Sequence, residues 1–155
     1  MPSKPSPLTQ EQGRVLLRLA RGTLNEHFGR PADGTEKAGP PLADPALQAP
    51  HGTFVTLKIG GDLRGCIGTL TGREPLVEGV RTHAINAAFH DPRFRPLTAE
   101  ELARVTIEVS VLTEPQPLRY DGAAEFRGVF APCRTWPLAC RRRESGPFVP
   151  SETYD

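Results

Sequence analysis

The segment Leu63–Gly68, which reads LRGCIG, brings a thiol, a guanidinium and two glycines close together in the sequence. If this segment is an extended strand, alternation places the side chains of Arg64 and Cys66 on the same face. A guanidinium beside a thiol favours the nucleophilic thiolate, and it can also clamp an anion. Gly65 and Gly68 would let a ligand or another part of the backbone approach closely. The segment therefore predicts an activated thiol or an anion pocket, and the alternative is a small buried cysteine with glycines at a bulge.

A polar loop with the sequence HDPRF supplies a second set of candidate residues. Asp91, Arg93 and Phe94 follow an expected helix, and loops held by rigid elements often carry function. The alternative is a self-bracing turn, in which Asp91 accepts a hydrogen bond from the backbone beyond it and pairs with Arg93. The sequence leaves both interpretations open, and we count Asp91 and Arg93 among the candidate ligand-binding residues.

Two polar residues, Glu108 and Ser110, alternate with valines in a segment that reads as a strand. Ordinary solvent exposure accounts for polar residues on one face of such a strand. If this strand lies beside the LRGCIG strand, however, Glu108 could face Arg64 across the sheet and close a polar site. We therefore include Glu108 as a candidate catalytic residue and Ser110 as a candidate binding residue.

The spacing of cysteines and histidines argues against a structural zinc site. Cys66, Cys133 and Cys140 form no CxxC pair, and no HxxxH pair is present. We expect His83 to be a packed or capping residue, and His90 to complement the C-terminal end of a helix. A dyad between Cys66 and either of these histidines is left open by the sequence.

Composition limits the classes of protein to which this chain can belong. With 155 residues, 37% hydrophobic and 24% charged, we expect one globular domain. A formal net charge of +1 does not favour nucleic acid as a partner. The N-terminal residues lack the apolar region of a signal peptide, and no segment is long and apolar enough for a membrane span. Three cysteines, an odd number, indicate reduced thiols and a cytoplasmic protein.

Apolar periodicity predicts an α+β fold with a mainly antiparallel sheet and flanking helices. The order of helix, hairpin, helix and strand is typical of this class. The expected elements are a helix capped by Thr9 and ended by Gly29, a loop over 30–52 with one helical turn, strands over 54–59 and 63–70 joined by a glycine turn, a helix from Pro75 to Asp91, a short helix capped by Thr98, and a strand over 104–113.

Three segments in this order resemble the AMMECR domain family: FVTLKIGGDLRGCIGTL, PLVEGVRTHAINAAFHDPRFRPLTAEEL and VTIEVSVLTEPQPL. The family hallmark LRGCIG is matched in full, and the resemblance runs from about Leu8 to Asp121. It implies an α+β domain with a larger and a smaller lobe, and a groove between them at which the LRGCIG segment matters.

The resemblance also implies partners. In bacteria and archaea, the domain is commonly encoded beside a Memo-type protein, which is similar to extradiol dioxygenases, and a radical SAM protein. Members of this kind are called AmmeMemoRadiSam system protein A. The resemblance assigns no reaction and no cofactor. The residues that it carries over by motif are Arg64, Gly65, Cys66, Gly68, Asp91, Pro92, Arg93, Phe94, Glu108 and Ser110.

The C-terminal part of the sequence departs from the family pattern. Family domains continue with a further strand, a TFLPQVW-like segment and a closing helix, and the residues after Gly122 match none of these. We therefore expect residues 1–122 to form an incomplete domain, and residues 123–155 to be a disordered or frame-shifted tail. A shifted reading frame predicts that another frame of the gene encodes family-like sequence beyond this point.

Together, these features predict a protein that acts with Memo-type and radical SAM partners in a small-molecule or modification pathway. Its site would have Cys66 and Glu108 as catalytic residues, and Arg64, Gly65, Gly68, Asp91, Arg93 and Ser110 as substrate-binding residues. The alternatives are a non-catalytic module that binds a partner protein, or an inactive truncated member of the family. The substrate, the cofactor and the oligomeric state are not indicated by the sequence.

Overall fold

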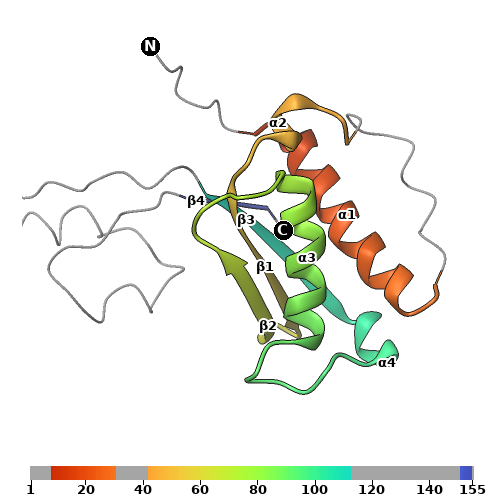
Figure 1. Ribbon diagram of the computed structural model, residues 1–155. Helices are drawn as coiled ribbons and strands as arrows, with labels where there is room; N and C mark the ends of the chain where they lie inside the picture. The colour runs from red at the N-terminus through yellow and green to blue at the C-terminus, as the bar shows by residue number, and fades with distance from the viewer. Residues whose placement is uncertain (1–7, 31–41, 113–150, 155) are drawn as a thin grey trace, which may run out of the picture. The chain divides into compact units, whose positions relative to one another are not determined.

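The computed structural model describes residues 8–30, 42–112 and 151–154. Within these residues the chain forms four helices and four strands (Figure 1). The elements are α1 (Gln10–His27), α2 (Pro45–Gln48), β1 (Gly52–Ile59), β2 (Asp62–Thr69), α3 (Leu76–Phe89), α4 (Ala99–Leu102), β3 (Val105–Leu112) and β4 (Ser151–Tyr154). The predicted α+β class with an antiparallel sheet is confirmed.

The four strands form one antiparallel sheet in the order β2-β1-β3-β4. β1 and β2 are joined by a tight turn at Gly60 and Gly61, whose φ angles of 61° and 92° lie in the left-handed region. Since β1 lies between β2 and β3, the LRGCIG strand is at an edge of the sheet. The strand that carries Glu108 is therefore not its direct neighbour.

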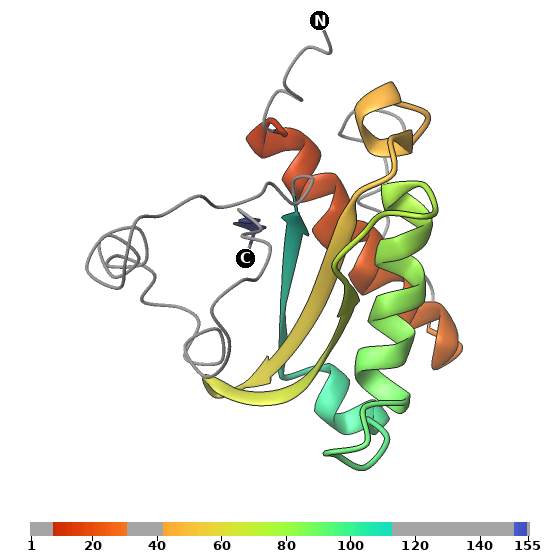
Figure 2. The same ribbon diagram turned by 60° about the vertical axis from the view of Figure 1, so that its left-hand side comes forward.

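One face of the sheet is covered by α3 and α1, and the core lies between these layers (Figure 2). In β1, Val55 and Leu57 are fully buried against the helices, whereas Thr56 and Lys58 between and beyond them are only partly buried. This alternation gives the sheet a second face, which we call the polar face. On β1, β2 and β3, the polar residues of this face are Thr56 and Lys58 of β1, Cys66 of β2, and Glu108 and Ser110 of β3.

Local sequence signals set the helix starts. The capping boxes predicted at Thr9 and Thr98 are both present: each threonine hydroxyl accepts a hydrogen bond from the backbone N–H three residues on, and Gln12 or Glu101 reciprocates. The capping box at Thr98 begins α4, a single turn. Its Glu101 also accepts a hydrogen bond from the side chain of Arg64 in β2. α3, by contrast, has Pro75 at its N-cap and no side-chain cap.

Part of the predicted tail belongs to the sheet. Ser151–Tyr154 form β4, which pairs antiparallel with β3, with Thr153 opposite Ser110. Within the segment 123–155, which we expected to be a disordered or frame-shifted tail, these four residues thus have strand structure. The remaining residues from 113 to 150 lie outside the described part of the chain, and the proposed boundary at residue 122 and the frame shift stay predictions. Among the described helices, none is long and apolar enough to cross a membrane.

Candidate functional site

The strand register brings three polar side chains into one row across the polar face. Cys66 of β2 lies opposite Thr56 of β1, which in turn lies opposite Glu108 of β3. Directly opposed residues of neighbouring strands have side chains on the same face, with Cβ atoms about 5 Å apart. The Sγ atom of Cys66 is 3.2 Å from the Oγ1 atom of Thr56, and Cys66 is partly exposed. The two predicted catalytic residues thus share a face, with a hydroxyl between them.

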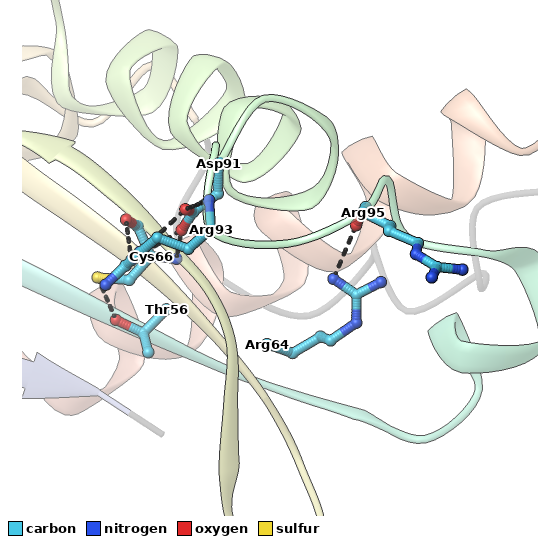
Figure 3. A network of polar contacts seen from close by, with 6 residues as sticks. All are labelled: Thr56, Arg64, Cys66, Asp91, Arg93 and Arg95. Atoms are coloured by element: carbon cyan, nitrogen blue, oxygen red, sulfur yellow. Dashed lines mark hydrogen bonds and ion pairs between the residues drawn. The ribbon is translucent and has the colours of Figure 1, made fainter.

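The structure places Arg64 away from Cys66, contrary to the alternation argument. The register of β1 and β2 shifts between Leu57 and Lys58, so that β2 carries one extra residue, Arg64, at a β-bulge. The bulge breaks the period of two between Arg64 and Cys66. In Figure 3 the Arg64 guanidinium points toward the loop that follows α3, away from the Cys66 sulfur.

Arg64 is occupied by contacts within the protein. Its Nε and Nη2 atoms donate to the two carboxylate oxygens of Glu101 at 3.0 and 2.9 Å, and its Nη1 atom donates to the carbonyl of Arg95 at 2.9 Å. These hydrogen bonds are the first cause that lowers the pKa of Glu101. The ring of Phe94 lies 5.9 Å from the guanidinium carbon. Arg64 therefore fastens β2 to α4 and its preceding loop, and it does not face Glu108.

Arg93 takes the position beside Cys66 that was expected for Arg64. Its Nη2 atom donates to the Cys66 carbonyl at 3.3 Å and to Asp91 Oδ2 at 2.8 Å, and its Nε atom donates to Asp91 Oδ1 at 3.0 Å. The same Asp91 Oδ2 accepts the backbone N–H of Cys66 at 2.9 Å. Figure 3 shows both side chains beside Cys66. We call Asp91 and Arg93 the edge pair.

The edge pair also fits the self-bracing turn considered for this loop, because the Arg93 backbone N–H donates to Asp91 Oδ1 at 3.1 Å. The Asp91 side chain is 1% exposed, whereas that of Arg93 is 50% exposed. The Arg93 hydrogen bonds hold the pKa of the Asp91 carboxyl far below its usual range. In return, Asp91 raises the pKa of Arg93, and the Cys66 side chain contributes a smaller effect in the same direction.

Glu108 is paired with a residue that the sequence analysis did not single out. Lys58 of β1 donates from its Nζ atom to Glu108 Oε1, and both side chains are partly exposed. Lys58 reaches Glu108 because β1 is the direct neighbour of β3, whereas β2 is not. Ser110 lies two residues further along β3, opposite Phe54, and it is buried. The alternation of apolar and polar residues in 54–59 is enough to place Thr56 and Lys58 on one face of the strand. Which residues they contact depends on how β1 pairs with β2 and β3.

The glycines of the LRGCIG segment are required by the packing of the protein itself. A Cβ atom on Gly65 would lie 2.1 Å from the carbonyl oxygen of Ala87 in α3. A Cβ atom on Gly68 would lie 2.2 Å from the carbonyl oxygen of Thr53 and 2.4 Å from the Phe54 ring. Of the two roles open for these glycines, close approach of another part of the backbone accounts for both.

Neither candidate histidine contacts Cys66. His83 is buried as expected for a packed residue, with its Nε2 atom 3.5 Å from the Thr69 hydroxyl and its Nδ1 atom without a hydrogen-bond partner. Burial lowers the pKa of His83, and Glu74 opposes this shift. His90 is exposed and its Nδ1 atom lies 3.0 Å from Asn86 Oδ1. In the described residues no cluster of three or more His, Cys, Asp or Glu side chains could hold a metal, and Cys133 and Cys140 lie outside these residues.

The arrangement supplies groups for thiol chemistry. Cys66 offers a partly exposed nucleophile, the Thr56 hydroxyl can donate to or accept from its sulfur, and the Glu108 carboxylate can take up a proton further along the same row. Arg93 adds a positive charge beside the Cys66 backbone, because its Nη2 atom donates to the Cys66 carbonyl. The arrangement therefore brings a thiol, a hydroxyl, a carboxylate and a guanidinium together on neighbouring elements.

Comparison with known proteins places these residues in a family. The AMMECR1 family model matches residues 17–150, and the match continues past residue 122. A protein of Methanothermobacter thermautotrophicus is 41% identical over 125 residues, which cover 79% of this chain and 62% of that protein. A protein of Aeropyrum pernix is 43% identical over 123 residues, which cover 76% of this chain and 50% of that protein.

The fold is similar to a solved structure as well. The crystal structure of an uncharacterized protein from Pyrococcus horikoshii is 37% identical, with a TM-score of 0.59 over 73% of this chain and 57% of that one. The match thus spans about half to three fifths of the length of these relatives. Because the family model covers most of its residues and the two relatives above are more than 40% identical, the chain belongs to the AMMECR1 family.

Proposed function

We propose that the protein acts through a thiol site on the polar face, with Cys66 as the nucleophile and Glu108 as the proton acceptor. Thr56 lies between them and its hydroxyl orients the thiol. Arg93 supplies the positive charge that the sequence analysis assigned to Arg64. The substrate would be a small molecule or a modified group presented to the polar face. The observation that supports this proposal most directly is the single cross-strand row of Cys66, Thr56 and Glu108.

Alkylation of the native protein tests the reactive thiol. In a full-length background in which Cys133 and Cys140 are replaced by serine, iodoacetamide should modify Cys66 at least as fast as it modifies an unstructured cysteine peptide. The reason is that a partly exposed thiol is accessible to the reagent, with the Arg93 guanidinium bound to the carbonyl of the same residue. Mass spectrometry of the modified protein over time measures the rate.

The control for this experiment is Cys66→Ser, which should remove the modification and change the melting temperature by less than about 4 °C. A shift of that size corresponds to about 1 kcal/mol in a domain of this size. A native Cys66 that reacts ~100-fold more slowly than the peptide would be a buried, inert thiol, and the catalytic role would then be abandoned. A large loss of stability in Cys66→Ser would also favour a packing role.

We further propose that the domain works with a Memo-type protein and a radical SAM protein in a small-molecule or modification pathway. This proposal rests on the family membership and on the resemblance described above. It concerns the activity of whole family proteins, and this chain matches only 62% and 50% of the length of the two relatives named above. The polar face would be the surface that a partner enzyme approaches, because the other face is covered by α1 and α3.

A non-catalytic binding module is the second candidate function, and one observation favours it. Several motif positions carried over from the family resemblance make contacts inside the protein: Arg64 binds Glu101, Gly65 packs on α3, and Asp91 binds the Cys66 backbone. A pull-down with the Memo-type protein separates the candidates. A binding module predicts that Glu108→Gln weakens capture several-fold and that Cys66→Ser does not, with equal thermal stability as the control.

A further inference from the structure

The backbone of Cys66 lies in β2, which is an edge strand of the sheet that the described residues form. Backbone groups on the outer side of an edge strand need partners other than the neighbouring strand, which for β2 is β1. In an antiparallel ladder, the N–H and C=O groups of one residue point to the same side of the strand. Both groups of Cys66 bond to the edge pair, the N–H to Asp91 and the C=O to Arg93. The N–H and C=O groups of Cys66 therefore point away from β1, toward the side of β2 on which a further strand could pair.

The edge pair offers the two groups that one residue of a neighbouring strand would offer. Asp91 supplies an acceptor at 2.9 Å from the Cys66 nitrogen, and Arg93 supplies a donor at 3.3 Å from the Cys66 oxygen. The pair is fixed at its base, because the Asp91 side chain is buried and the backbone of this loop is hydrogen-bonded on both sides. Phe94 N–H donates to the Asp91 carbonyl at 3.1 Å, and Leu97 N–H donates to the Ala88 carbonyl at 2.8 Å.

We propose that Asp91 and Arg93 are positioning residues for Cys66, acting as a substitute for a neighbouring strand. By holding the Cys66 backbone on both its polar groups, they fix the direction of its Cβ and keep its sulfur beside the Thr56 hydroxyl. Arg93 has a second role, because its Nη2 atom lies 3.3 Å from the Cys66 carbonyl and so places a positive charge next to the residue that carries the thiol. The backbone part stands on its own, and the effect on thiol chemistry rests on the proposed function.

Two measurements test the two parts separately, in the full chain with Cys133 and Cys140 replaced by serine. Hydrogen exchange of the Cys66 amide, taken relative to the core amide of Val55, reports the backbone contact. In Asp91→Asn, and more strongly in Asp91→Ala, we expect this relative exchange to become about tenfold faster or more, because the amide loses its charged acceptor. The core amide corrects for any change in global stability.

The second measurement is the rate of iodoacetamide alkylation as a function of pH. In Arg93→Gln we expect alkylation of Cys66 to be several-fold slower at pH 7 and to approach the unmutated rate at high pH, where thiols ionise without help. Arg93→Lys keeps the positive charge but lacks the planar guanidinium with its several donors, and it should restore part of the rate at pH 7. A purely structural role would change the rate equally at every pH.

Arg64→Gln is the matched control, because Arg64 also donates to the loop after α3 but makes no hydrogen bond with Cys66. It should leave both Cys66 measurements unchanged. Unchanged relative exchange in both Asp91 variants would overturn the positioning proposal, and so would an Arg64→Gln effect as large as theirs. An unchanged alkylation profile in Arg93→Gln would overturn the thiol part. Slow alkylation of the unmutated protein would instead refute the proposed function and leave the exchange result standing.

Discussion

Gly65→Ala is expected to be the most destabilising single substitution considered for this protein. The new Cβ would lie 2.1 Å from the Ala87 carbonyl oxygen and 3.0 Å from its carbon, and both are backbone atoms of α3. Because no flexible side chain can give way, the helix and the strand must move apart. Overpacking costs about 1–3 kcal/mol even where side chains can adjust. We therefore expect a loss of at least about 3 kcal/mol, a large part of the stability of an ordinary domain.

Thermal unfolding followed by circular dichroism would measure this effect as a fall of ~12 °C or more in melting temperature. Gly22→Ala is the matched control, because Gly22 lies inside α1 and a Cβ there would meet no atom within 4 Å. Alanine should stabilise that helix position by about 0.5–1 kcal/mol. A Gly65→Ala protein within about 1 kcal/mol of the unmutated protein would mean that α3 does not press on β2 as described.

Asp91→Asn should cost about 2–3 kcal/mol at neutral pH. Removing one partner of a buried ion pair costs about 3–5 kcal/mol, and the value is reduced here because the Arg93 side chain is half exposed. Asparagine keeps the shape of the side chain but lacks the negative charge of the carboxylate. That charge strengthens the hydrogen bonds that Asp91 accepts from Arg93 and from the Cys66 N–H. Urea unfolding at neutral pH gives the difference in free energy.

This difference should depend on pH with a defined sign. The pKa of Asp91 is lower in the folded protein than in the unfolded chain, where it is about 3.9. The unfolded state therefore binds more protons in acid, and the contribution of Asp91 is present above about pH 4 and is lost as the pH falls below it. Urea unfolding at several pH values should show the unmutated protein and Asp91→Asn converging in acid. A constant difference down to pH ~2 would contradict the ion pair.

Glu101→Gln serves as the comparison for this series. The pKa of Glu101 is also lowered, first by its hydrogen bonds with Arg64, but its side chain is 31% exposed. Solvent screening reduces the strength of such a pair. We therefore expect the same direction of pH dependence with a smaller loss of stability than in Asp91→Asn.

Local signals in the sequence were sufficient to predict most of the elements. Both capping boxes, at Thr9 and Thr98, and the turn at Gly60 and Gly61 act over a few residues, so their physical causes are visible in the sequence alone. The period of two in residues 54–59 likewise identified β1 and its buried face. Short-range chemistry decides these features, and distant parts of the chain do not change them.

The arrangement of the site depended on features that act over longer distances. A regular two-residue hairpin would set Thr56 opposite Gly65, and the single extra residue at Arg64 instead sets it opposite Cys66. The pattern of apolar and polar residues did not place this bulge, although a bulge at the glycines of this segment was one of the alternatives that the sequence left open. The order of the strands placed Lys58, and not Arg64, beside Glu108. The sequence did indicate Cys66, Glu108 and the edge pair. The Thr56 hydroxyl between the two catalytic candidates was found only from the pairing of β1 with β2 and β3.

The contacts of the edge pair bear on how copies of this protein behave toward one another. An unpaired strand at the border of a sheet is a template on which a second molecule can build, and such growth leads to aggregates. On β2 the main-chain groups in the middle of the strand are already taken by two charged side chains. An incoming strand would have to displace a buried carboxylate before it could extend a ladder. We therefore expect the two residues that bind the Cys66 backbone to oppose pairing of β2 with a strand of another copy.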